Sequence, residues 1–135
     1  MKRALPRQPR IAFLQPGQLM PNNARDALHS FNVSTTALAI LGALRDAGYE
    51  DLHFYDIACE QGDVLREFNA HLAYKGAPDA DVTAWLGAVA PDAVLLTSMF
   101  TCDFPATEHA IALVRATLPD ALIAVGGRHA SLMPH

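Results

Sequence analysis

Residues 91–127, PDAVLLTSMFTCDFPATEHAIALVRATLPDALIAVGG, decide the fold. The stretch holds three predicted elements, a strand over residues 92–100, a helix over 105–119 and a strand over 121–127. Ile111, Val114 and Leu118 share one face of the helix, and both strands are continuous apolar runs. A strand, a helix and a second strand in this order indicate a right-handed βαβ unit with parallel strands.

Five more elements are predicted upstream of this stretch. They are a strand over residues 10–15, a helix over 35–49, a strand over 51–58, a helix over 63–73 and a short helix over 81–90. Ser34 is placed to cap the first helix, and Gly48 is placed to end it. The second helix is predicted because Leu65, Phe68 and Leu72 recur at helical spacing.

The segment between the first strand and the first helix, residues 18–33, is polar and rich in Asn. It also contains Pro21, so we expect a long connection of the kind that is functional or mobile.

The element order predicts the fold class. Strands that alternate with helices and form continuous apolar runs are typical of a doubly wound parallel α/β sheet, Rossmann-like or flavodoxin-like, here with about four strands. We expect a flexible lead-in over residues 1–9 and one domain over residues 10–135. A flavodoxin-like sheet has a fifth strand, so we expect the natural polypeptide to continue and the fourth strand to be an exposed edge.

Composition narrows the class of protein. The chain has 135 residues, a formal net charge of −4 and 18% charged residues, so we expect neither nucleic acid nor a membrane as a partner. There is no signal-peptide pattern at the start, and Cys59 and Cys102 belong to no short-spaced cluster. These features predict a cytoplasmic protein with reduced thiols.

Candidate site residues follow from the fold class, because open α/β sheets bind ligands outside the carboxyl ends of their strands. The segments expected at this edge are residues 15–18, 56–59, 97–105 and 126–131. Gly126 and Gly127 stand where the backbone leaves the fourth strand. Two interpretations are open for this pair: a tight turn alone, or a backbone that must pass close to a large ligand.

Several common sites are excluded. A dinucleotide fingerprint needs G-x-G-x-x-G after the first strand, but Gly17 is the only glycine there. A P-loop is absent, and so are the acids that a receiver domain needs after its first strand. No group of Cys or His residues has metal-ligand spacing, so no metal site is expected. We expect His53 to be a partly buried structural residue and His109 to be solvated.

The segments LAILGALRDAGYEDLHFYDIA, PDAVLLTSMFTCDF and LPDALIAVGGRHASLMP, with Gln-Pro after the first strand, carry a resemblance. Together they resemble the N-terminal cobalamin-binding domain of cobalamin-dependent radical S-adenosylmethionine (SAM) enzymes, over roughly residues 10 to 135. The resemblance implies a Rossmann-like domain that holds the corrin ring over the carboxyl ends of the strands. The cofactor-binding residues that it implies are Gln15, Pro16, Ser98, Met99, Phe100, Thr101, Gly126, Gly127, Arg128, His129 and Ala130.

Two motifs related to this chemistry are missing. The C-x-x-x-C-x-x-C motif that holds the catalytic iron–sulfur cluster is absent, so the 4Fe-4S cluster and SAM are expected in a domain outside this chain, in cis or in trans. The D-x-H-x-x-G motif that supplies an axial histidine in the methionine synthase type is also absent. Asp51 and His53 have its spacing, but Asp56 replaces the glycine, and we do not assign His53 as a cobalt ligand.

The expected function is therefore a cobalamin-binding module of a radical SAM enzyme, a methyltransferase acting on an unactivated carbon. The protein's part is to position the cofactor, and this chain alone is not expected to be catalytic. Two alternatives stay open: a degenerate scaffold or substrate-access domain without cobalamin, and a small flavodoxin-like binder of a nucleotide or flavin.

Overall fold

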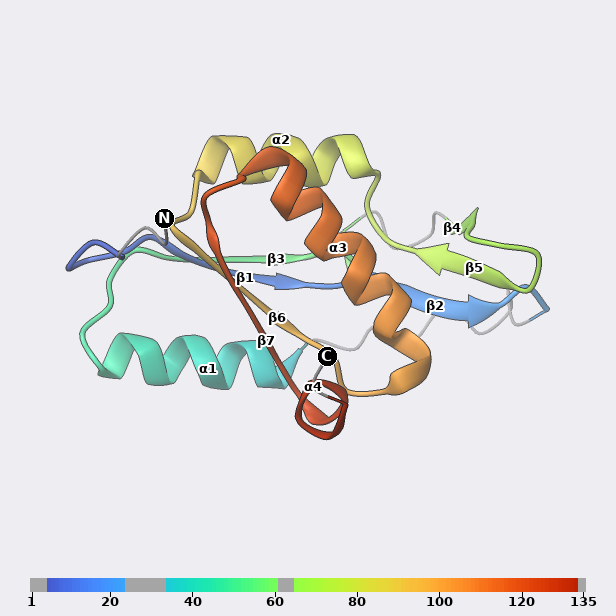
Figure 1. Ribbon diagram of the computed structural model, residues 1–135, viewed down its shortest axis with the longest axis horizontal. Helices are drawn as coiled ribbons and strands as arrows, with labels where there is room; N and C mark the ends of the chain where they lie inside the picture. The colour runs from blue at the N-terminus through green and yellow to red at the C-terminus, as the bar shows by residue number, and fades with distance from the viewer. Residues whose placement is uncertain (1–4, 24–33, 61–64, 134–135) are drawn as a thin grey trace.

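The computed structural model describes residues 5–23, 34–60 and 65–133, and it is an α/β protein built on a four-stranded parallel sheet. The strand order is β3 (Leu52–Asp56), β1 (Ile11–Gln15), β6 (Ala93–Thr97) and β7 (Leu122–Gly126). Helix α1 (Thr35–Asp46) lies on one side of this sheet, and α2 (Asp79–Val89) and α3 (Phe104–Thr117) lie on the other (Figure 1). The predicted parallel α/β sheet is confirmed.

The central strands are buried on both faces, as continuous apolar runs require. Ile11, Ala12, Phe13 and Leu14 of β1 are all buried. The main core lies between the sheet and the pair α2 and α3, and its buried residues include Leu14, Ile57, Val82, Leu86, Val94 and Val114. Val114 comes from the apolar helix face that the sequence predicts, and Val82 and Leu86 lie in the short helix predicted over residues 81–90.

Helix α1 begins and ends where its capping residues predict. The Ser34 side chain accepts a hydrogen bond from the backbone N–H of Ala37 at 3.2 Å, which satisfies a donor of the first turn. After the last turn, Gly48 adopts a φ of 93° and donates its N–H to the Arg45 carbonyl. A left-handed residue at this position favours glycine.

A second sheet corrects two of the predictions. It is antiparallel, with the order β2 (Gln18–Pro21), β5 (Leu72–Lys75) and β4 (Leu65–Glu67), where a polar connection and a helix were predicted. Asn69 explains the missing helix. Its side-chain oxygen accepts from the N–H groups of His71 and Leu72, and the N–H groups of Phe68 and Asn69 bond to the Leu72 carbonyl. These bonds close a hairpin, so the helical spacing of the apolar residues is coincidental.

Parts of three sequence predictions lie outside the described residues. They are residues 1–4 of the predicted lead-in, residues 24–33 of the polar connection and residues 63–64 of the predicted helix.

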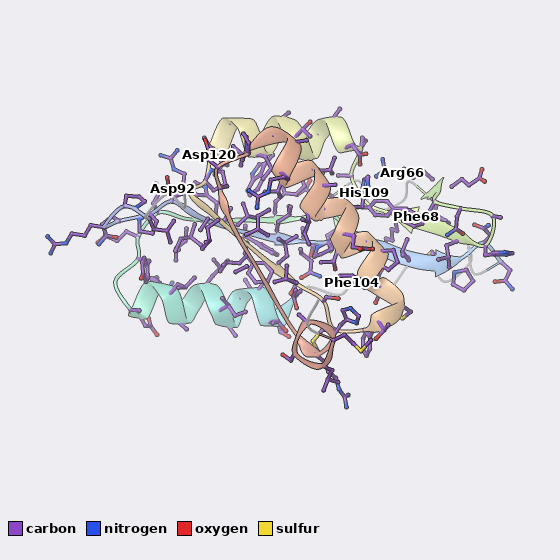
Figure 2. All side chains as sticks on the ribbon, in the orientation of Figure 1. Arg66, Phe68, Asp92, Phe104, His109 and Asp120 are labelled. Carbon is purple, nitrogen blue, oxygen red and sulfur yellow. The ribbon has the colours of Figure 1, made fainter. Side chains whose placement is uncertain are left out.

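One carboxylate links the small sheet to α2 and also links α2 to α3. Asp79 Oδ1, at the start of α2, accepts from Arg66 Nη2 at 2.6 Å and from His109 Nε2 of α3 at 2.9 Å. The Arg66 guanidinium also lies 4.5 Å from the centre of the buried Tyr74 ring. Figure 2 shows Arg66, Phe68 and His109 gathered at this junction. His109 is therefore half-buried and paired rather than solvated.

This junction predicts an acid-sensitive contribution to stability. Burial raises the pKa of Asp79, but the hydrogen bonds from His109 and Arg66 outweigh it and hold the pKa below its usual value. A carboxyl group whose pKa is lower in the folded than in the unfolded chain stabilises the folded state at pH values above its unfolded pKa of about 4. This stabilisation is lost as the pH falls through the lower pKa of the folded state. Thermal unfolding of wild-type protein should therefore lose more stability between about pH 5 and pH 3 than Asp79→Asn does. Glu108→Gln, an exposed position on α3, is the control and should follow wild type.

The chain after β6 and β7 places two short elements at the carboxyl edge of the parallel sheet. A 3-10 turn, η2 (Thr101–Asp103), precedes α3, and a one-turn helix, α4 (Arg128–Leu132), follows β7. The sequence predicts neither element. Strand β7 is the end of the parallel sheet, and Leu122, Ala124 and Gly126 on it are exposed, as expected for an edge.

Candidate functional site

A cavity of about 450 Å³ lies at the carboxyl ends of β1, β3 and β6, where open α/β sheets bind ligands. Its walls come from both sheets, from the start of α1 and from the turn before α3. The lining residues are Gln15, Pro16, Gly17, Gln18, Ser34, Thr35, Thr36, Asp56, Ala58, Cys59, Lys75, Thr97, Ser98, Met99, Phe100, Asp103 and Thr107.

The wall formed by β1 and β6 carries buried oxygen atoms without partners. Thr97 Oγ1, Ser98 Oγ and Gln15 Oε1 have no hydrogen-bond partner among the described residues. Thr97 is 7% exposed and Ser98 is 1% exposed. A buried polar atom without a partner costs about 1–3 kcal/mol, so these atoms beside the cavity are candidates for hydrogen bonds with a ligand or a water molecule.

The opposite wall is held by Asp56, the last residue of β3. Its carboxylate accepts from the N–H groups of Ala58 and Cys59 at 3.0 and 3.1 Å, which fixes the turn after the strand. Burial, together with the neighbouring Asp56, raises the pKa of the Cys59 thiol. A raised pKa keeps this sulfur protonated, so the cavity provides no activated thiolate nucleophile at Cys59.

The cavity also contains one buried cation and one partly buried acid. Lys75 of β5 is buried, and its position brings the small sheet into the cavity wall. Burial raises the pKa of Asp103. The protonated form of this carboxyl, which can donate a hydrogen bond, is therefore more favoured than that of an exposed Asp. The walls therefore offer both donors and acceptors, which suits a polar ligand without a strong net charge.

Two large apolar side chains line the cavity just before η2. Met99 and Phe100 follow β6 and are 46% and 59% exposed. Large exposed apolar side chains next to a cavity are typical of a surface that is covered by a ligand or a partner.

The structure brings some of the predicted site residues to this cavity and leaves others out. Gln15, Pro16, Ser98, Met99 and Phe100 line it. The predicted residues that do not line it are Thr101, Gly126, Gly127, Arg128, His129 and Ala130.

The two glycines after β7 have separate roles. Gly127 has a φ of 99°, and a Cβ atom on it would lie 2.5 Å from the Ser98 carbonyl oxygen. Close backbone packing against β6 therefore explains Gly127, which is the turn interpretation. A Cβ atom on Gly126 would meet nothing within 4 Å. Only Gly126 leaves open space at the rim of the sheet.

His129 is a packing residue in this structure. It is 5% exposed, and the centre of its ring lies 4.2 Å from the centre of the Phe104 ring. Its backbone N–H donates to the Ser98 carbonyl at 3.1 Å. Its Nδ1 lies within hydrogen-bond distance of Thr101 Oγ1, at 3.1 Å. These contacts hold α4 against η2 and the end of β6, beside the cavity and outside it.

The sequence did not indicate three parts of the cavity wall, which are Lys75, Thr107 and the first residues of α1. Lys75 was missed because its segment was predicted to follow a helix, and the start of α1 was missed because it follows a long connection. Gly76 next to Lys75 could have indicated this part of the wall, because a glycine in a strand often marks a close approach of another backbone or a ligand. A Cβ atom on Gly76 would lie 2.8 Å from an Ile57 methyl carbon.

Comparisons of the chain with protein-family models, with curated protein sequences and with solved structures gave no match. Among the described residues, no cluster of His, Cys, Asp and Glu side chains is suited to hold a metal ion. None of the helices in the described ranges is both long and apolar enough to cross a membrane. The geometry of the cavity is therefore the main basis for a functional proposal.

Proposed function

We propose that this chain is a cobalamin-binding module, and that it presents the cofactor to a radical SAM domain that is outside this sequence. The observation that carries the proposal is that Gln15, Thr97 and Ser98, which line the cavity at the carboxyl edge of the sheet, each have a buried oxygen atom without a partner among the described residues. The helices on both sides of a parallel sheet support the finer assignment of a Rossmann-like, doubly wound fold.

The residues present suit the chemistry of cobalamin. The corrin ring is flat and apolar on its faces, and its periphery carries amides that donate and accept hydrogen bonds. The unpartnered oxygens of Gln15, Thr97 and Ser98 match amide donors. Met99 and Phe100 offer apolar contacts to the ring, and Gly126 leaves the adjoining rim open. Cobalamin is larger than this cavity, so only part of it would enter.

Within the proposed enzyme, the residues of this chain bind and orient the cofactor. Methylcobalamin supplies a methyl group for transfer to a radical on an unactivated carbon of the substrate. The iron–sulfur cluster and SAM would be held by the other domain, in cis or in trans, because the chain lacks the three-cysteine motif. Burial among Thr97, Ser98 and Phe100 would exclude water from one side of the corrin.

The alternatives have less support. In a scaffold without cobalamin, Phe100 or Arg128 would fill the rim, but both are exposed and Arg128 does not line the cavity. Packing of Gly127 and His129 on Ser98 does cover part of the rim, and this observation favours the scaffold. A nucleotide or flavin site would need backbone N–H groups after β1. Pro16 has none, and strand β2 begins at Gln18.

Reconstitution with hydroxocobalamin tests the proposal. After gel filtration, the folded protein should retain the corrin absorbance in the visible spectrum, and its unfolding temperature should rise because the ligand binds only the folded state. Flavin mononucleotide under the same conditions is the matched control and should be lost on the column. Folded protein that retains no corrin, with its unfolding temperature unchanged, would favour the scaffold.

A further inference from the structure

The end of the parallel sheet has unpaired backbone groups at β7. Within this strand, the Leu122 N–H donates to the Asp92 carbonyl and the Gly126 carbonyl accepts from the Ser98 N–H, so these residues face β6. Alternate residues of a strand direct their backbone groups to opposite sides. The N–H and C=O groups of Ile123 and Val125 therefore point away from β6, where the described residues provide no strand.

Opposite charges lie at the two ends of β7. Asp120 is exposed just before the strand, and Arg128 is exposed just after it. Figure 2 places Asp120 and Asp92 together at the end of the sheet that is far from Phe104. The strand between them carries no charged residue. An edge with an acidic start, an apolar centre and a basic end is complementary to itself when two copies run antiparallel.

The apolar surfaces near β7 show the same complementarity. A groove of about 700 Å³ lies at the start of β7, and Leu5, Leu118 and Leu122 contribute to its walls. Beyond the other end of the strand, Leu132 and Met133 are 68% and 48% exposed. Antiparallel pairing brings the exposed side chains of one copy to the end where the groove of the other copy lies.

We propose that two copies of this chain associate through antiparallel pairing of their β7 strands. The register that fits places Ile123 opposite Val125 of the second copy, so that the outward N–H and C=O groups of the two residues bond to each other. Ala124 then lies on the two-fold axis, and Asp120 meets Arg128 of the second copy. The two parallel sheets join into one continuous sheet. The edge lies outside the cavity and the test uses protein without cobalamin, so this proposal can fail while cobalamin binding stands. The fifth strand expected in a longer natural polypeptide would take the same edge, and finding it paired with β7 would overturn the proposal.

Sedimentation equilibrium over roughly a hundredfold range of protein concentration tests the proposal, since dimerisation follows mass action. We expect a reversible monomer–dimer equilibrium for wild-type protein. Asp120→Arg and Arg128→Asp should each raise the dimer dissociation constant by about tenfold or more, because each converts two symmetric attractive pairs into repulsive ones. The double variant, with both charges exchanged, should restore the wild-type dissociation constant.

A second pair of variants tests the strand pairing itself. Val125→Pro removes an outward N–H that bonds only across the edge, whereas Val125→Ala removes a similar amount of side-chain packing and keeps the N–H. We expect the proline variant to be monomeric and the alanine variant to dimerise. In wild type, the Ile123 and Val125 amides should gain protection from hydrogen exchange as the concentration rises. A monomer at every concentration, or a dimer that tolerates Val125→Pro and both charge reversals, overturns the proposal.

Discussion

Gly127→Ala should destabilise the protein by about 3 kcal/mol or more. Gly127 has a φ of 99°, a region that side-chain-bearing residues rarely adopt, and the new Cβ would lie 2.5 Å from the Ser98 carbonyl oxygen. The neighbouring atom belongs to the backbone of β6, so it cannot move aside as a flexible side chain would. The structure must therefore separate β6 from α4, which also weakens the packing of His129.

The adjacent glycine is a matched control for this prediction. A Cβ on Gly126 meets nothing within 4 Å, so Gly126→Ala should change stability by less than about 0.5 kcal/mol. Chemical denaturation of both variants, followed by circular dichroism, measures the difference. Equal effects at the two positions would contradict the separate roles assigned to Gly126 and Gly127.

The double variant Thr97→Val and Ser98→Ala should weaken cobalamin binding by about a hundredfold, about tenfold for each hydroxyl lost. The same variant should leave the protein without cofactor as stable as wild type, or more stable by about 1 kcal/mol. These two hydroxyls are buried and have no partner among the described residues, so they contribute no hydrogen bond to the stability of the protein without cofactor. Opposite effects on stability and affinity are the signature of polar groups that are kept for a ligand.

Thr107→Val is the control for the stability measurement. Thr107 lines the same cavity, but its hydroxyl donates to the Thr97 carbonyl at 3.5 Å, so its removal should destabilise the protein. Thermal unfolding without cofactor and visible-light titration with hydroxocobalamin provide the two readouts. A loss of stability in the double variant comparable to that in Thr107→Val, with cobalamin affinity unchanged, would assign the two hydroxyls a structural role.

The parallel sheet was predictable because its signals are local and strong. Each strand is a short apolar run, and each of its helices has an apolar face or a cap, such as Ser34 for α1. The edge position of β7 also followed from the element order. The same reasoning locates the candidate site at the carboxyl edge, and Gln15, Ser98 and Phe100, which were named for it, line the cavity there.

The small sheet and part of the site could not be predicted, because they depend on contacts between distant residues. Leu65, Phe68 and Leu72 fit a helix by spacing, and only the hydrogen bonds of Asn69 decide for a hairpin. The sequence leaves two interpretations open for Gly127, and only its close approach to the Ser98 backbone across the sheet favours the turn. His109 looked exposed on its helix, and its partner Asp79 lies on another helix.

The small sheet contributes to the cavity wall, so unfolding of this sheet would release a molecule bound in the cavity. Lys75 in the cavity wall belongs to that sheet, which the ion pair of Arg66 with Asp79 attaches to α2. Tyr74 of β5 is fully buried in the main core and its ring packs on His109, so the small sheet should unfold together with the core. Heat should therefore release a bound molecule in the same transition that melts the main core, so the retained ligand and the helical circular dichroism signal should be lost together.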